Sequence, residues 1–194
     1  LFVKDLVKHK DEKSIIKVYG DTNEKEYLDN SYINLNIKKN FFKSTSNTYI
    51  DKFLTYEKKF NSDVIEIHNR PSYVKKIRTI TQCKIILFFH NDPLTMNGSK
   101  DIDERNNLLK NIDHFVFNSQ WSLNRFKINL KNFEAYKNKF SVVYQCVNKK
   151  KINFKNKKKI ISFIGKLNSA KGYDIFGKSI VRILNKYPDW KSIV

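Results

Sequence analysis

The chain has 194 residues, of which 40% are hydrophobic and 14% aromatic, enough to build a buried core for one domain or for one and a part. No apolar run approaches the ~20 residues of a membrane-spanning helix, and Cys83 and Cys146 lack metal-ligand spacing and fit a reducing compartment. The formal net charge of +19 invites an anionic partner, although a composition rich in lysine, asparagine and isoleucine also follows from AT-rich codons.

The two ends of the chain each predict an interrupted element. The first residues, LFVKDLVKHK, predict an amphipathic helix with Phe2 and Leu6 on its apolar face. The last residues, WKSIV, predict a strand that is just beginning. Because the chain also starts without methionine, we expect a fragment that is cut at both ends.

Between these ends, short apolar runs rich in β-branched residues predict strands. The runs span 14–20, 32–36, 63–68, 84–90, 114–119, 140–145 and 159–165. Because apolar residues in them do not alternate with polar ones, we expect strands that are covered on both faces.

Longer segments with a helical period separate these strands. The expected helices span 48–61, 72–81, 103–112, 120–127 and 173–187. Strands that alternate with helices indicate βαβ units, a parallel sheet and an α/β fold. The lysine-rich segment NKKKINFKNKKK (148–159) lacks an apolar stripe and predicts a linker, so we expect one unit over 1–147 and a second over 148–194.

The second unit contains a match to the phosphate-binding pattern G-x-x-x-x-G-K-[ST], formed by Gly172, Gly177, Lys178 and Ser179. A working loop of this kind follows its strand directly, whereas Gly172 comes several residues after the strand predicted at 160–164. We therefore expect Lys178 and Ser179 to lie inside a helix over 173–186.

An anion site is expected upstream of that match. Gly165 follows the strand, Lys166 and Lys171 lie on the loop, and the next helix begins near Gly172. Backbone N–H groups and the dipole at a helix N-terminus favour a phosphate group. The alternative is an ordinary loop with two solvated lysines.

The segment IISFIGKLNSAKGYDIFGKSIVRILNKYPDW resembles the first strand, loop and helix of the donor domain in retaining glycosyltransferases of the family 4 type. That family has an apolar strand, Gly-Arg-Leu, a short gap, Lys-Gly and a helix that ends near a proline. Gly165, Leu167, Lys171 and Gly172 match, and Lys166 stands where the family usually has arginine. Lysine keeps the charge but lacks the planar fork that grips a diphosphate at two points.

Upstream segments resemble the same family in order and spacing. DVIEIHNRP (63–71) resembles a strand that ends in a cleft-facing, histidine-rich segment, and KIILFFHNDP (84–93) resembles the next strand, whose terminal histidine touches the donor sugar. IDHFVFNSQWSLNRF (112–126) resembles the strand and serine before the last helix of the acceptor domain. VVYQCV (142–147) stands where the family often has Asn-Gly. The family's glycine-rich loop and paired glutamates are absent, as expected of a fragment.

The resemblance implies the two-domain GT-B architecture. Residues 1–147 would form most of an acceptor-side Rossmann-like domain, and 148–194 the linker and the start of a Rossmann-like nucleotide-sugar-binding domain. Transfer of a sugar from a nucleotide-diphosphate sugar to a saccharide or lipid-linked acceptor, with retention, is the implied reaction. It implies a cytoplasmic enzyme of envelope polysaccharide or lipopolysaccharide synthesis that needs no metal or cofactor; the fragment alone need not be active.

The residues expected at the site come from strand ends and from the glycine loop. His68 and His90 end consecutive apolar runs, and ligands of open α/β sheets bind at the carboxyl ends of the strands. The resemblance implies that His90 is catalytic and contacts the transferred sugar, and that Gly165, Lys166, Lys171 and Gly172 bind the donor diphosphate. The expected cleft-lining residues are His68, Asn69, Arg70, Asn91, Asp92 and Ser119. A single histidine at such a place is often only a structural hydrogen-bonding group.

Peripheral contact with an anionic membrane is expected at NIKKNFFKSTS (36–46), where Phe41 and Phe42 lie among lysines. The alternative is that both phenylalanines pack inward. A basic nucleic-acid-binding α/β module would explain the charge, but the lysines are dispersed and the aromatics lie in apolar runs, so we expect no nucleic-acid partner. A sugar-nucleotide epimerase or a phosphorylase of the same architecture stays open as a third function.

Overall fold

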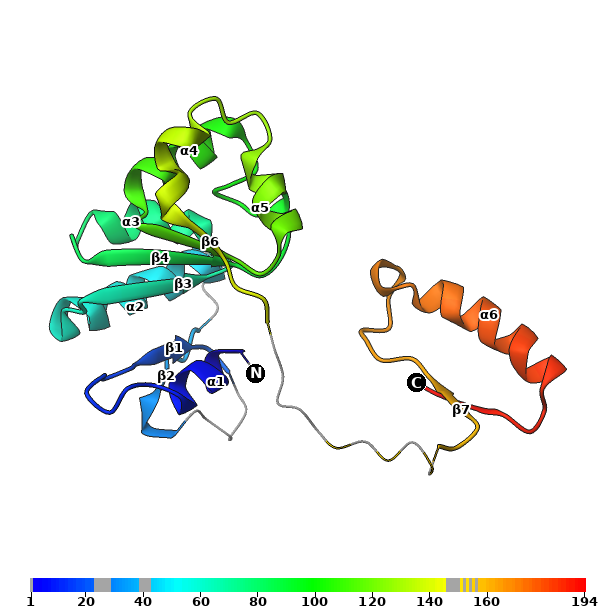
Figure 1. Ribbon diagram of the computed structural model, residues 1–194. Helices are drawn as coiled ribbons and strands as arrows, with labels where there is room; N and C mark the ends of the chain where they lie inside the picture. Colours follow the sequence, from blue (N-terminus) through cyan, green and yellow to red (C-terminus); the bar gives the residue numbers. More distant parts are fainter. Residues whose placement is uncertain are drawn as a thin grey trace. The chain divides into compact units, whose positions relative to one another are not determined.

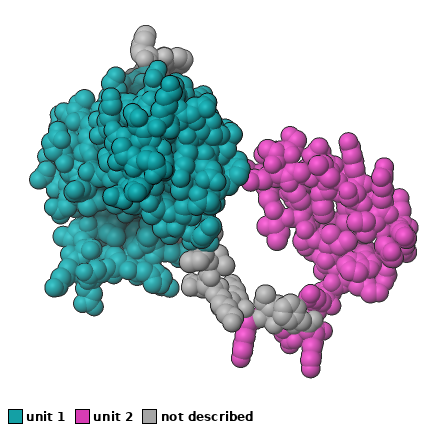
Figure 2. All heavy atoms as spheres, turned by 45° about the horizontal axis from the view of Figure 1, so that its top comes forward, with its two compact units in different colours: residues 1–146 teal, residues 147–194 magenta. Residues whose placement is uncertain are grey.

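The computed structural model describes residues 2–22, 29–38, 43–145, 151, 153, 155 and 157–194. It divides into two compact units, residues 1–146 and 147–194, which Figure 2 shows in teal and magenta. The division lies within one residue of the boundary expected from the lysine-rich segment. Phe41 and Phe42 lie outside the described residues, so membrane contact at this pair stays a prediction.

Unit 1 is built around a four-stranded parallel sheet with the strand order β3-β4-β5-β6 (Figure 1). The strands are β3 (Val64–His68), β4 (Lys84–Phe89), β5 (His114–Phe117) and β6 (Phe140–Val142). Because their order follows the chain, every connection advances in the same direction and places its helix on the same face. The predicted α/β fold with a parallel sheet is confirmed.

The helices around the main sheet are α2 (Thr45–Phe60), η2 (Pro71–Tyr73), α3 (Val74–Arg78), η3 (Pro93–Thr95), α4 (Ile102–Asn111), α5 (Gln120–Lys127) and η4 (Phe133–Lys139). Some of them begin at a polar side chain that caps the helix. Ser44, Asp101 and Ser119 each accept a hydrogen bond from the backbone N–H three residues ahead, which satisfies a donor that the first helical turn leaves unpaired. The helix predicted over 120–127 is confirmed at both ends.

The core lies between the sheet and these helices and is rich in phenylalanine. Phe89, Phe115, Phe117 and Phe126 are fully buried and meet one another with centroid distances such as 5.3 Å for Phe89 and Phe117. Burying each such side chain stabilises the fold by about 1.5–3 kcal/mol. This aromatic cluster therefore holds α5 against β4 and β5.

The expectation that every strand is covered on both faces was wrong for β3. Its buried residues Ile65 and Ile67 alternate with the exposed Val64 and Glu66. The reason is the strand order, which places the helices on one face, so that the other face of this edge strand meets solvent.

A smaller substructure precedes the main sheet. It contains α1 (Phe2–Lys8), β1 (Val18–Gly20), η1 (Asp29–Ser31) and β2 (Tyr32–Asn34), with β1 and β2 forming a separate two-stranded parallel sheet. Tyr19 joins it to α2, because its ring meets Phe53 edge-on at 5.1 Å and its carbonyl accepts from the Tyr49 hydroxyl at 2.7 Å. The strand predicted over 14–20 is shorter than expected, since only its last three residues pair.

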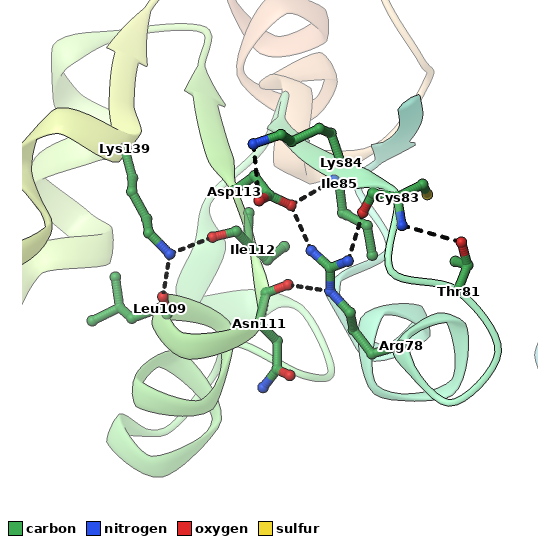
Figure 3. A network of polar contacts seen from close by, with 10 residues as sticks. All are labelled: Arg78, Thr81, Cys83, Lys84, Ile85, Leu109, Asn111, Ile112, Asp113 and Lys139. Carbon is green, nitrogen blue, oxygen red and sulfur yellow. Dashed lines mark hydrogen bonds and ion pairs between the residues drawn. The ribbon is translucent and has the colours of Figure 1, made fainter. Parts of the chain in front are cut away.

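The amino-terminal edge of the main sheet is held by a partly buried polar network, drawn in Figure 3. The Arg78 guanidinium donates to the carbonyls of Asn111 and Cys83 at 2.7 and 2.6 Å and pairs with the Asp113 carboxylate. Asp113 also accepts from the backbone N–H of Ile85 at 2.8 Å. One arginine thus joins the end of α3 to the starts of β4 and β5.

Unit 2 consists of a strand, a loop and a helix followed by a second strand. Its elements are β7 (Ile160–Ser162), η6 (Ser169–Lys171), α6 (Tyr173–Lys186) and β8 (Lys191–Ile193). The helix predicted over 173–186 is confirmed and contains Lys178 and Ser179. The phosphate-loop pattern is therefore not a phosphate loop, because its lysine and serine lie within the second turn of a helix. Among the described residues, no helix has the length and apolar character needed to cross a membrane.

Candidate functional site

Two histidines meet at the carboxyl edge of the main sheet. His68 ends β3, and His90 directly follows β4, whose Phe88 is the register partner of His68. By the alternation of side chains along a strand, both rings project from the face opposite the phenylalanine core. Phe88 shares that face and stacks on His68 with a centroid distance of 4.5 Å.

The two imidazole rings share a hydrogen bond in their common plane. The Nδ1 atom of His68 lies 2.9 Å from the Nε2 atom of His90, while the ring centroids are 5.2 Å apart and the planes differ by 6°. Since an imidazole N–H lies in the plane of its ring, this bond means that the rings meet edge to edge rather than face to face. One nitrogen donates and the other accepts, so the tautomer of one ring determines the tautomer of the other.

Gln145 sets the direction of this bond. Its side-chain amide nitrogen lies 2.7 Å from the Nδ1 atom of His90, and an amide nitrogen can only donate. His90 therefore accepts at Nδ1, carries its proton on Nε2 and donates to His68. The proton of His68 then lies on its own Nε2 atom, which is 3.5 Å from the Glu66 carboxylate. We call Glu66, His68, His90 and Gln145 the histidine relay.

The environment of His90 favours its neutral imidazole form. Burial, followed by the electrostatic effect of His68, lowers the pKa of His90 below its ordinary value of 6.5. A neutral His90 keeps Nδ1 as an acceptor near neutral pH. The ring can thus accept a hydrogen bond, or a proton, from a hydroxyl group placed where Gln145 lies.

Two asparagines fix the backbone of His90. Asn69 accepts from the His90 N–H at 2.7 Å and adopts a left-handed conformation with φ of 54°, which asparagine tolerates better than most residues. Asn118, at the end of β5, donates to the His90 carbonyl at 2.7 Å. Residues that follow three neighbouring strands thereby position one imidazole.

Asp92 and Ser119 lie at the same edge but have structural partners. Asp92 accepts from the Leu94 N–H at 3.0 Å and binds the Arg125 guanidinium at two points, with its Oδ2 atom 3.0 Å from Nη2. Burial tends to raise the pKa of Asp92, but the hydrogen bonds from Arg125 and Leu94 outweigh it and hold the pKa below its ordinary value. Ser119 is the N-cap of α5. The side chains of Asp92 and Ser119 therefore stabilise the segments that follow β4 and β5.

The remaining expected residues of this edge are exposed. Arg70 follows β3 and donates to the carbonyl of Asn69 at 3.0 Å, and Asn91 lies between His90 and Asp92. Seven residues, Phe88, Phe89, His90, Val116, Asn118, Val143 and Gln145, line a hollow here. It leaves essentially no space for a water molecule.

The expected diphosphate residues lie together on one loop of unit 2. Asn168 caps η6 by accepting from the Lys171 N–H at 3.2 Å, and Gly172 has φ of 74°, where it begins α6. Lys166 and Lys171 are exposed on this loop, close in sequence to the positive end of the helix dipole. Asp174 in the first helical turn supplies an opposing negative charge.

Four residues of this edge, Glu66, Asn118, Arg125 and Gln145, were not among the site residues expected from the sequence. Asn118 and Gln145 are polar residues at the ends of the predicted runs 114–119 and 140–145. The criterion used for the histidines, a polar residue at the carboxyl end of a strand, would therefore have identified both. Glu66 is hidden inside an apolar run. Arg125 lies on a helix, where no strand-end signal applies.

Comparison with known proteins gives no family-model match and no match to a curated protein. Over the part of the chain that the structure describes, no group of three or more histidine, cysteine, aspartate or glutamate residues is arranged to hold a metal ion.

Proposed function

We propose that the chain belongs to a glycosyltransferase that moves a sugar from a nucleotide-diphosphate sugar to a saccharide or lipid-linked acceptor, with retention of configuration. The observation that carries this proposal is the position of His90, which is fixed by Asn69 and Asn118 at the carboxyl edge of a parallel sheet and engaged by an exposed amide at Nδ1. The ordered resemblance of segments 63–71, 84–93, 112–126 and 160–190 to family 4 glycosyltransferases supports it.

His90 is suited to a sugar hydroxyl group. Gln145 is exposed and donates to Nδ1, and a hydroxyl that took its place would donate to the same atom. His68 accepts from the opposite nitrogen and keeps the ring in the tautomer that this contact requires. In the proposed reaction, His90 therefore orients the transferred sugar.

Unit 2 is proposed to hold the leaving diphosphate. Lys166 and Lys171 supply positive charge beside the N-terminus of α6, and negative charge on the diphosphate grows as the glycosidic bond breaks. The proposed place of action is the cytoplasm, on acceptors of envelope polysaccharide or lipopolysaccharide synthesis, with peripheral contact to an anionic membrane.

The experiment is calorimetric titration of the full-length protein with UDP and GDP, followed by assays of sugar transfer from the corresponding nucleotide sugars. Replacing both Lys166 and Lys171 by methionine is expected to weaken nucleotide binding at least about tenfold, since each removes a charge beside the phosphates. Lys178→Met with Lys186→Met, on α6 itself, is the matched control and should leave binding within about twofold.

Two outcomes would contradict the proposal. Equal losses from both lysine pairs would mean that only the general positive charge attracts the nucleotide. Tight binding of single-stranded RNA with no turnover of any nucleotide sugar would favour the nucleic-acid-binding alternative.

A further inference from the structure

An exposed tryptophan lies on the first turn of α5, at the same edge as His90. Trp121 has 57% of its surface exposed, although tryptophan is usually largely buried. The guanidinium carbon of Arg125 lies 5.7 Å from the centre of its ring and covers one side of it. The face of an indole is flat, apolar and weakly negative, so an exposed indole can stack on another flat group.

The start of α5, which carries the indole, is tied to residues around His90. Arg125 is bound at two points by Asp92, two residues after His90. By a second route, Ser122 donates to the Asn118 side chain at 3.0 Å, and Asn118 donates to the His90 carbonyl at 2.7 Å. Because both routes use fixed side chains, Trp121 is preorganised relative to His90, which lowers the entropic cost of binding at its surface.

Two amide side chains are exposed on the helix that carries the indole. They belong to Gln120 and Asn124, and the Gln120 amide nitrogen donates to Asn124 at 2.9 Å. A pyranose ring presents its C–H groups on one face and its hydroxyl groups around its rim. The C–H face is weakly positive and suits the negative face of an indole, and amides donate to and accept from hydroxyls.

We propose that Trp121 is a stacking platform for a pyranose ring of the acceptor saccharide, with Gln120 and Asn124 binding its hydroxyl groups. The identification of this saccharide as the acceptor rests on the proposed function. The platform adds a subsite for a carbohydrate acceptor at the start of α5, whereas His68 lies at the end of β3.

A lipid surface suits this patch less well. A membrane-binding helix combines several apolar residues with a lysine-rich polar face. In α5 the residues exposed beside Trp121 are Gln120 and Asn124, and Leu123 and Phe126 are buried in the core.

The direct test is nuclear magnetic resonance of the indole N–H groups in the full-length protein. Trp121 and Trp190 each give a signal from this chain, and Trp190→Phe assigns them. Methyl glycosides of glucose, galactose and N-acetylglucosamine are added in turn, with the open-chain polyol sorbitol as control. At least one glycoside should shift the Trp121 signal, while Trp190 and the sorbitol titration stay unchanged.

The kinetic test uses the acceptor identified in the transfer assay. Trp121→Ala should raise the KM for the acceptor about threefold to tenfold, the range expected for loss of one aromatic contact, and leave the KM for the nucleotide sugar within about twofold. Trp121→Phe should restore most of the affinity. An equal rise in both KM values would indicate a merely structural role and overturn the inference.

The failures of the two proposals are distinguishable. If no nucleotide sugar is turned over but a glycoside shifts Trp121, the glycosyltransferase proposal fails and a saccharide subsite remains. If sugar transfer occurs but no glycoside shifts Trp121, the platform is wrong. A Trp121 signal that responds only to vesicles containing anionic lipid would also overturn it, in favour of membrane contact.

Discussion

The Nδ1 atom of His68 and the Nε2 atom of His90 lie 2.9 Å apart in nearly coplanar rings, so a single proton links two residues that are 22 positions apart in the chain. Only one of the facing nitrogens can carry that proton while the bond persists. The Gln145 amide at the far side of His90 assigns it to His90. The relay therefore has a direction, and its direction can be measured.

Nitrogen-15 spectra of the histidines should show both rings protonated at Nε2, with Nδ1 as acceptor, at neutral pH. His68→Phe removes the acceptor for the His90 N–H and should lower the free energy of unfolding by about 1–3 kcal/mol, because a half-buried donor loses its partner. Glu66→Gln is the control, since this exposed residue lies 3.5 Å from His68 and should contribute less than about 1 kcal/mol. A His90 protonated at Nδ1 would contradict the relay.

Folding stability should depend on pH through His90. Its pKa in the folded chain is below 6.5, the ordinary value, so the unfolded chain binds more protons between these two pKa values. The free energy of unfolding should therefore fall as the pH drops below 6.5 and level off below the folded pKa. Denaturant unfolding of the parent protein and of His90→Gln, in which this part of the slope should vanish, checks the prediction.

Gln145→Glu should raise the pKa of His90, because it places a carboxylate beside Nδ1 and stabilises the protonated ring. A proton titration of the imidazole signals measures the change. Gln82→Glu makes the same change of charge before β4, at the opposite edge of the sheet, and should leave the pKa of His90 unaltered. If both variants raised it equally, the shift would come from net charge and not from contact.

Arg78→Met should destabilise unit 1 by about 2–4 kcal/mol in chemical unfolding, because it leaves two carbonyls and the Asp113 carboxylate without their partner (Figure 3). Lys84→Met is the matched control. Lys84 is 3.9 Å from the same carboxylate but its side chain is 73% exposed, so its loss should cost less than about 1 kcal/mol. Equal effects would mean that the network contributes only through its net charge.

Two glycines of unit 2 should respond to alanine in opposite directions. Gly172 has φ of 74°, so Gly172→Ala should destabilise α6 by about 1–2 kcal/mol. Gly177 lies inside α6 with open space around its α-carbon, and Gly177→Ala should stabilise the helix by about 0.5–1 kcal/mol. Hydrogen exchange of the α6 amides measures both. Destabilisation by Gly177→Ala would contradict the helical placement of the phosphate-loop pattern.

Local sequence signals were sufficient to predict most elements of this protein, although β1 and β7 are shorter than expected. Ser119 before an apolar helical stripe predicts where α5 begins, and the stripe over 173–186 predicts α6 despite the phosphate-loop pattern within it. The alternation of such helices with apolar runs predicts the parallel sheet, and parallel strands bring their carboxyl ends, with His68 and His90, to one edge. These features depend on residues within a few positions of one another, which is the range over which sequence patterns act.

Only the tertiary structure decided which groups touch. Gln145 reaches His90 across 55 positions of chain, Arg125 reaches Asp92 across 33, and the rings of His68 and His90 become coplanar because β3 and β4 pair with His68 beside Phe88. A shift of one residue in that register would turn one ring to the core face. The register is set by the packing of Ile65, Ile67, Ile85 and Leu87 against the helices, a sum of many contacts distant in sequence that no local pattern contains.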